Sequence, residues 1–105
     1  MSLSDQEFRL NADHALEQAQ RALTSMDGTD DVEVELHNGV LQIVFEDPTP
    51  AKFVVSPNAP VRQIWVSAMS RSYKLAWSDE AGAFALDGEP LDALLKRLVR
   101  QFLDT

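Results

Sequence analysis

Apolar residues recur at intervals of three and four positions over the first quarter of the chain. The stripe consists of Phe8, Ala12, Ala15, Leu16, Ala19, Ala22, Leu23 and Met26. This spacing places them on one face of a helix. Ser4, followed three residues later by Glu7, forms a capping-box pattern at the start, and Asp27-Gly28 supplies a stop signal. The pattern therefore predicts an amphipathic helix over residues 4–26.

The spacing changes to two residues soon after this helix. Between residues 32 and 36, two valines and a leucine alternate with Glu33 and Glu35, as in a strand with one side facing a core. Asn38-Gly39 is the strongest short signal for a type I′ hairpin turn. We therefore expect residues 40–46 to return antiparallel to the first strand, with both glutamates facing outward.

Four further segments have strand patterns and are separated by turn residues. They are residues 51–56, 61–68, 72–77 and 83–86. Apolar residues at helical spacing, from Leu91 to Phe102, then predict a closing helix near residues 90–103. Short connections favour an antiparallel sheet, and two amphipathic helices need a shared surface. We predict a single α+β domain over residues 1–105: a two-layer α-β sandwich with the N- and C-terminal helices on one face of an antiparallel sheet of about six strands.

The other face of this sheet has no second layer in the sequence to cover it. Gln63, Trp65 and Ser67 alternate with Ile64 and Val66. If Ile64 and Val66 point toward the helices, the other three side chains point away from the core. Two interpretations of Trp65 stay open. Its ring is either half-buried by cross-strand neighbours or is an exposed anchor for a binding partner.

The charge of the chain is distributed unevenly. The net charge is −8, but residues 1–47 contain eleven acids and two bases, for a net −9, whereas residues 48–105 contain six acids and seven bases, for a net +1. Nucleic-acid binding depends largely on Lys and Arg against phosphate, so the acidic half argues against a nucleic-acid partner. It favours cations or basic proteins instead.

Other features of the composition exclude whole classes of function. The chain has no cysteine, which removes disulfides, thiolate metal ligands and cysteine nucleophiles. No segment approaches the roughly 20 apolar residues of a membrane helix, and the N-terminus lacks a basic segment followed by an apolar one. We therefore expect a cytoplasmic protein with no membrane association. No nucleophile elbow, zinc-protease motif or phosphate loop is present, so we expect no enzymatic activity.

The densest group of charges lies where the first helix meets the first strand. The stretch DGTDDVEVE contains five carboxylates and no Lys or Arg: Asp27, Asp30, Asp31, Glu33 and Glu35. Successive outward side chains of a strand are only about 7 Å apart, so these groups repel one another. An inert solvated surface is one interpretation. Soluble surfaces usually mix both signs, however, and strands disfavour Asp and Glu, so we favour a surface that a cation normally neutralises.

The residue types restrict which cation this stretch could hold. A calcium EF-hand is excluded, because Leu23 and Ser25 occupy positions that require acids. His14 and His37 have no partner at ligand spacing, which argues against a preformed transition-metal site. Carboxylates on a convex edge suit hard or borderline cations that are held weakly, with water completing the coordination shell.

The overall pattern resembles the frataxin family, and within it the bacterial CyaY branch. The resemblance depends on MDGTDDVEVELHNGVLQIVFE (residues 26–46) and RQIWVSA (residues 62–68), and it covers the chain from Phe8 to about Phe102. It implies the α-β sandwich described above. It also implies a small protein of iron–sulfur cluster assembly that binds ferrous and ferric iron weakly, with other divalent cations competing.

By position, the resemblance implies two sets of site residues. The first is an iron-binding acidic ridge, a term used below for Asp27, Asp30, Asp31, Glu33 and Glu35, extended by Asp13 and Glu17. The second is a partner-binding surface made of Asn38, Gln63 and Trp65, together with Asp31 and Glu33 of the ridge. The implied partners are the cysteine desulfurase and the iron–sulfur scaffold protein. Without iron, we expect a monomer.

The sequence departs from the family pattern at three positions. Thr24 and Ser25 stand where relatives often carry acids, and Arg9 stands where some bacterial relatives have a histidine. These differences shift the ridge toward the strand. Two other functions stay open at this point: stand-alone iron storage or ferroxidase activity, and a generic acidic interaction module without a metal. The sequence does not distinguish an iron donor from a regulator of cluster synthesis.

Overall fold

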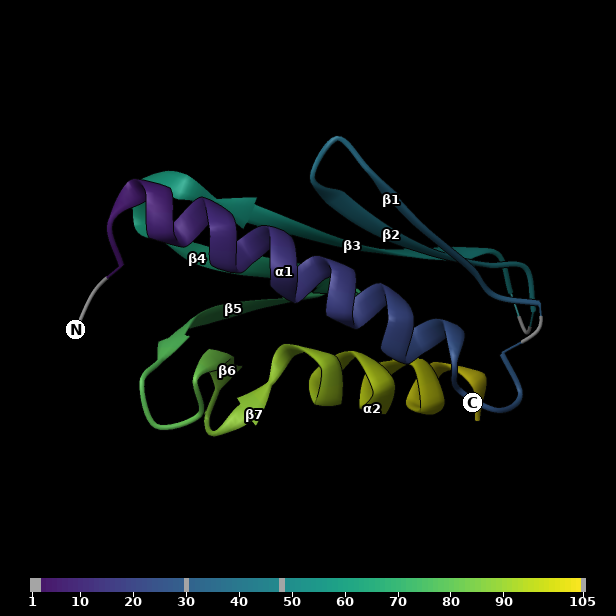
Figure 1. Ribbon diagram of the computed structural model, residues 1–105. Coiled ribbons are helices and arrows are strands. Elements are labelled where there is room, and N and C mark those ends of the chain that lie inside the picture. The colour runs from purple at the N-terminus through teal and green to yellow at the C-terminus, as the bar shows by residue number, and fades with distance from the viewer. Residues whose placement is uncertain (1–2, 30, 48, 105) are drawn as a thin grey trace.

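In the computed structural model, two helices cover one face of a seven-stranded antiparallel sheet (Figure 1). The structure describes residues 3–29, 31–47 and 49–104. In chain order the elements are α1 (Asp5–Thr24), β1 (Glu33–His37), β2 (Val40–Phe45), β3 (Ala51–Asn58), the 3₁₀ helix η1 (Ala59–Val61), β4 (Gln63–Ala68), β5 (Arg71–Ser78), β6 (Ala83–Leu86), β7 (Glu89–Pro90) and α2 (Leu91–Leu103). The strands lie in the sheet in chain order, each antiparallel to the next. The predicted fold class is confirmed.

The start of α1 is fixed by the predicted capping box. The Glu7 backbone N–H donates to the Ser4 hydroxyl oxygen over 3.2 Å, and the Ser4 N–H donates to the Glu7 carboxylate over 3.1 Å. The ionised Glu7 carboxylate is stabilised mainly by the backbone N–H of Ser4 and to a smaller extent by the Ser4 hydroxyl. Both interactions hold the pKa of Glu7 below its ordinary value. Both partners lie within one turn, which is why the sequence alone predicts this helix start.

The core lies between the helices and the inner face of the sheet. Its strand residues are Leu41, Ile43, Phe45, Phe53, Val55, Ile64, Val66, Ala68, Leu75 and Phe84, and its helix residues are Phe8, Ala12, Leu16, Ala19, Leu23, Leu91, Leu94, Leu95, Leu98 and Val99. Phe102, in the last turn of α2, is only partly buried, and its ring centroid lies 4.5 Å from that of Phe45. The apolar stripes read from the sequence therefore form one continuous core.

Two short elements differ from the predicted ones. Val61, predicted as the start of the strand over 61–68, ends the 3₁₀ helix η1, and Arg62 has a left-handed φ of 51°, so β4 begins only at Gln63. Glu89 and Pro90 form the seventh strand, paired with β6, so α2 begins at Leu91. The Arg97 guanidinium donates to the Glu89 carboxylate over 2.9 and 3.0 Å, which ties β7 to α2 and lowers the pKa of Glu89.

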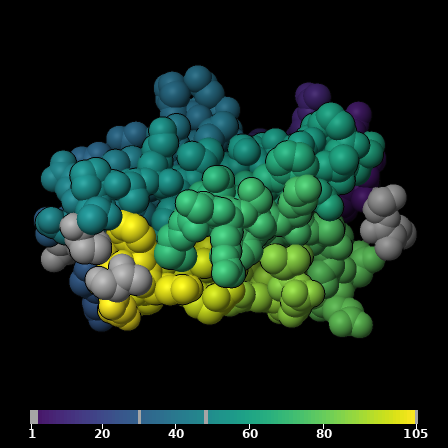
Figure 2. Space-filling model, turned by 180° about the vertical axis from the view of Figure 1, so that it is seen from behind, coloured from purple at the N-terminus to yellow at the C-terminus, as the bar shows by residue number. Residues whose placement is uncertain are grey.

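The outer face of the sheet is open, as predicted from the sequence. Seen from this side, the strands coloured teal to green form the surface of the molecule, and the blue β1–β2 hairpin projects at its upper edge (Figure 2).

Positive φ angles at Asn38 and Gly39, 52° and 75°, confirm the predicted hairpin turn. In the part of the chain that the structure describes, no helix is long and apolar enough to span a membrane.

Candidate functional site

Glu33 and Glu35 lie on the exposed side of β1, which is an edge strand of the sheet. Val34, which lies between them, and Leu36, which follows Glu35, are partly buried against the core. Because side chains of a strand alternate between faces, both glutamates project on the open face, about 7 Å apart. This is the orientation predicted from their alternation with apolar residues.

A third glutamate, Glu46, joins these carboxylates and was missed in the sequence analysis. Asp31, Glu33 and Glu46, together with Val44, line an open hollow of about 230 Å³ at the edge of the sheet. The hairpin register pairs Glu33 with Val44 and Glu35 with Gln42. Continued by two positions, the same register sets Asp31 opposite Glu46. The sequence did carry this signal, because the Asn38-Gly39 turn fixes the register.

The turn between α1 and β1 is held by a buried threonine. The Thr29 hydroxyl donates to the Met26 carbonyl over 2.9 Å and lies 3.4 Å from the Leu23 carbonyl, and the Val32 N–H donates to the Thr29 carbonyl over 3.0 Å. These bonds satisfy carbonyls at the helix end. They leave the side chains of Asp27 and Asp31 exposed on either side of the turn. Asp30 lies outside the described residues.

The side of this turn that faces α1 carries hydroxyls in place of carboxylates. Thr24 and Ser25 donate their hydroxyls to the carbonyls of Gln20 and Arg21, over 2.7 and 2.9 Å. They therefore close the helix end instead of extending the ridge. The described residues that line the adjacent hollow, Leu23, Thr24, Thr29, Val32 and Val34, include no acid.

The carboxylates of the acidic ridge do not form one compact site. Asp13 and Glu17 are exposed on α1, in the helix layer, whereas Glu33 and Glu35 project on the opposite face of the sheet. Within residues 3–29, 31–47 and 49–104, no group of three or more His, Asp or Glu is placed to hold one metal ion. The ridge is therefore a strip of separate charges around a sheet edge, without a preformed chelating cage.

One basic side chain lies against the ridge. The Arg100 Nη1 atom, from α2, is 3.5 Å from the position that a Cβ atom would take at Gly28, whose φ is 77°. Its guanidinium therefore covers the turn beside Asp27. Arg100 is far from this turn in the chain, so no local sequence pattern indicates that the two lie close together.

Trp65 is exposed on the open face of β4, with 36% of its surface accessible. Its Nε1–H donates to the Gln63 side-chain oxygen over 2.9 Å, and the Lys74 Nζ lies 4.9 Å from its ring centroid. These two neighbours hold the indole in place without covering it. Asn38 is not next to it: β3 separates β4 from the hairpin that ends in Asn38, and β2 and β4 are about 10 Å apart.

Two terminal helices on one face of an antiparallel meander, an acidic edge strand and an exposed tryptophan on the open face define a frataxin-like α-β sandwich. The family model of the frataxin-like domain matches residues 1–105, so the chain belongs to this family. The resemblance noted in the sequence is thereby confirmed.

Three curated relatives are each named "Iron-sulfur cluster assembly protein CyaY". The protein of Pseudomonas aeruginosa is 38% identical over 69 residues, which cover 64% of this chain and 62% of that protein. The protein of Pseudomonas fluorescens is 29% identical over 105 residues, covering 96% of this chain and 90% of the relative. The protein of Herminiimonas arsenicoxydans is 30% identical over 101 residues, covering 94% and 89%.

Proposed function

We propose that this chain takes part in iron–sulfur cluster assembly as a non-catalytic protein. It binds ferrous or ferric iron weakly on the acidic ridge, and it docks on the cysteine desulfurase and scaffold through the ridge and the open sheet face. The names of the three relatives, each an iron–sulfur cluster assembly protein, support a role in this process. The observation that carries the proposal is a group of exposed carboxylates, Asp31, Glu33, Glu35 and Glu46, that form no ion pair among the described residues.

Weak iron binding follows from the geometry of these carboxylates. Glu33 and Glu35 are about 7 Å apart along one strand, too far for both to ligate one ion without bending toward it. An ion at this edge would therefore take one or two carboxylates and keep several waters. Such a site selects charge more than coordination geometry, so other divalent cations are expected to compete with iron.

Docking on a basic partner follows from the shape and the charge of the same edge. A convex acidic edge fits a positively charged cleft, and opposite charges accelerate association when the salt concentration is low. Trp65 lies on the adjoining open face and provides a rigid aromatic ring, the kind of side chain that dominates binding at many interfaces. The carboxylates would thus govern the association rate, and the indole would govern the lifetime of the complex.

The role of the indole predicts a kinetic effect. Trp65→Ala should raise the dissociation rate of the desulfurase complex by roughly tenfold or more, because it removes an exposed aromatic anchor. The association rate should change little, since no charge is altered. Surface plasmon resonance with immobilised desulfurase separates the two rates.

Leu10→Ala is the matched control. Leu10 is 58% exposed, but it lies on α1 in the helix layer. Its truncation should leave both rates unchanged. An equal loss of affinity for the two variants, or no change for Trp65→Ala, would rule out the open face as a docking surface.

A further inference from the structure

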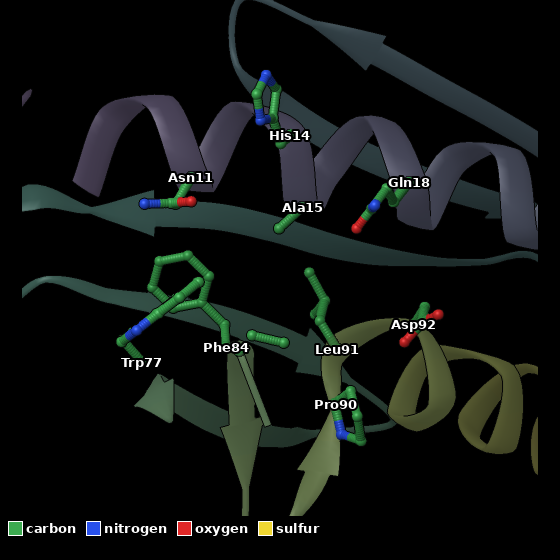
Figure 3. Close-up of a pocket in the computed structure, with 11 residues that line it drawn as sticks. Asn11, His14, Ala15, Gln18, Trp77, Phe84, Pro90, Leu91 and Asp92 are labelled. Atoms are coloured by element: carbon green, nitrogen blue, oxygen red, sulfur yellow. The ribbon is translucent and has the colours of Figure 1, made fainter. Parts of the chain in front are cut away.

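A third hollow lies on the helix side of the molecule, away from the carboxylates of β1 and from Trp65. It is bounded by α1, by β5 and β6, and by the start of α2 (Figure 3). Its volume is about 180 Å³. Pockets for drug-sized ligands have roughly 300–1,000 Å³, so this hollow accepts a group of side-chain size.

One wall of the hollow is apolar and rigid. The rings of Trp77 and Phe84 pack edge to face with centroids 5.3 Å apart, and Phe84 packs against Phe8 in the same way at 5.6 Å. The Trp77 Nε1–H donates to the Asp79 carboxylate over 3.2 Å, which holds the indole in place. Leu91, which is buried, completes this wall.

Three of the polar side chains around the hollow carry oxygen atoms, and the fourth is the His14 ring. The Asn11 side-chain N–H donates to the Glu7 carbonyl over 2.9 Å, so its own oxygen is left to accept a hydrogen bond from the hollow. The side chains of Gln18 and Asp92 lie at the other end of the hollow (Figure 3). Three oxygen-bearing side chains from α1 and α2 thus surround an apolar wall.

The hollow has few charged groups. Among the described residues that line it, Asp92 supplies a carboxylate and His14 an imidazole, and there is no lysine or arginine. The nearest basic residue along α2, Lys96, lies one turn after Asp92, and Asp92 forms no ion pair within the described ranges. The first turn of α2 carries partial positive charge, but Asp92 offsets it by accepting the Ala93 N–H over 2.9 Å. The exposed Asp92 carboxylate and the accepting oxygens around the hollow therefore favour a donor-rich cation over an anion.

We propose that this groove binds the guanidinium group of an arginine side chain carried by a partner protein. A guanidinium is planar, stacks on aromatic rings and carries five N–H donors, which match the partly exposed ring of Trp77 and the surrounding oxygens. Free arginine fits less well, because the described lining residues include no lysine or arginine to pair with its α-carboxylate. The proposal does not depend on the acidic ridge or on iron.

The test is an NMR titration with N-acetyl-arginine amide, followed at the two tryptophan indole N–H signals. The Trp77 signal should shift in a saturable way, while the signal of Trp65, on the opposite face, should not move. N-acetyl-citrulline amide has nearly the same shape without the charge, and it should cause no saturable shift. Free arginine should bind more weakly than the capped form.

Two variants localise the effect. Asp92→Asn should weaken binding by about two- to fivefold, as expected for an exposed charge pair. Ala15→Met should abolish it, because Ala15 lines the hollow and the longer side chain fills it. Asp104→Asn makes the same chemical change at the other end of α2 and should leave the affinity unchanged.

Three outcomes would overturn the proposal. Equal binding of the arginine and citrulline compounds would show that charge plays no part. Unchanged affinity in Asp92→Asn, with an otherwise unaltered spectrum, would place the ligand elsewhere. Tighter binding of free arginine than of the capped form would make the groove a small-molecule site and remove the assignment to a protein partner.

Discussion

The triple reversal Asp31→Lys, Glu33→Lys and Glu35→Lys should weaken binding to a cysteine desulfurase at low salt by at least about a hundredfold, because like charges then face a basic cleft. All three side chains are exposed, and none forms a hydrogen bond or an ion pair among the described residues. The fold should therefore survive the change. For the unchanged protein, affinity should fall steeply with salt, since the Debye length shrinks from about 30 Å at 0.01 M to about 10 Å at 0.1 M.

A charge-matched control separates docking from net charge. The ridge variant carries Glu33→Lys and Glu35→Lys. The control carries Glu80→Lys and Asp104→Lys, which change the net charge by the same amount at two exposed positions outside the ridge. Calorimetric titration across a salt series should show the loss only for the ridge pair. Equal losses of affinity for both pairs would show that the change in net charge alone causes the effect. A triple reversal that binds like the unchanged protein would refute docking through the ridge.

Leu98→Ala should lower the free energy of unfolding by about 2–5 kcal/mol, the cost of truncating a buried leucine and leaving a cavity. Leu98 is only 1% exposed and lies on α2 within the core. Domains of this size have a total stability of about 5–15 kcal/mol, so the variant would lose a large part of it. Urea unfolding followed by circular dichroism measures the change.

Leu10→Ala provides the same chemical substitution outside the core. Because Leu10 is 58% exposed, its truncation should change the stability by no more than about 0.5 kcal/mol. A loss below about 1 kcal/mol for Leu98→Ala would contradict the packing of α2 on the sheet that the structure shows.

The parts of the fold that were predictable depend on local chemistry. The capping box of Ser4 and Glu7 and the turn at Asn38-Gly39 each involve residues within one turn of chain. Alternation of apolar and acidic residues likewise fixed the outward direction of Glu33 and Glu35. Short connections between strands then left a meander as the simplest sheet order.

The parts that were missed depend on contacts between distant segments. The two-residue strand β7 exists only through its pairing with β6, and two residues are too few to show a period. The same holds for the contact of Arg100 with Gly28 and for the groove beside Trp77, which joins α1 to β5, β6 and α2. Glu46 is different, because counting the register from the hairpin turn would have found it.

The most direct test of the proposed function is a paramagnetic NMR titration with ferrous iron under anaerobic conditions. A bound paramagnetic ion broadens the signals of nearby amides. The earliest broadening should occur at residues 27–35 and at Glu46, and added magnesium should reverse it, since the ridge selects charge more than geometry. Broadening spread evenly over the surface, or centred on His14 and His37, would contradict iron binding at the acidic ridge.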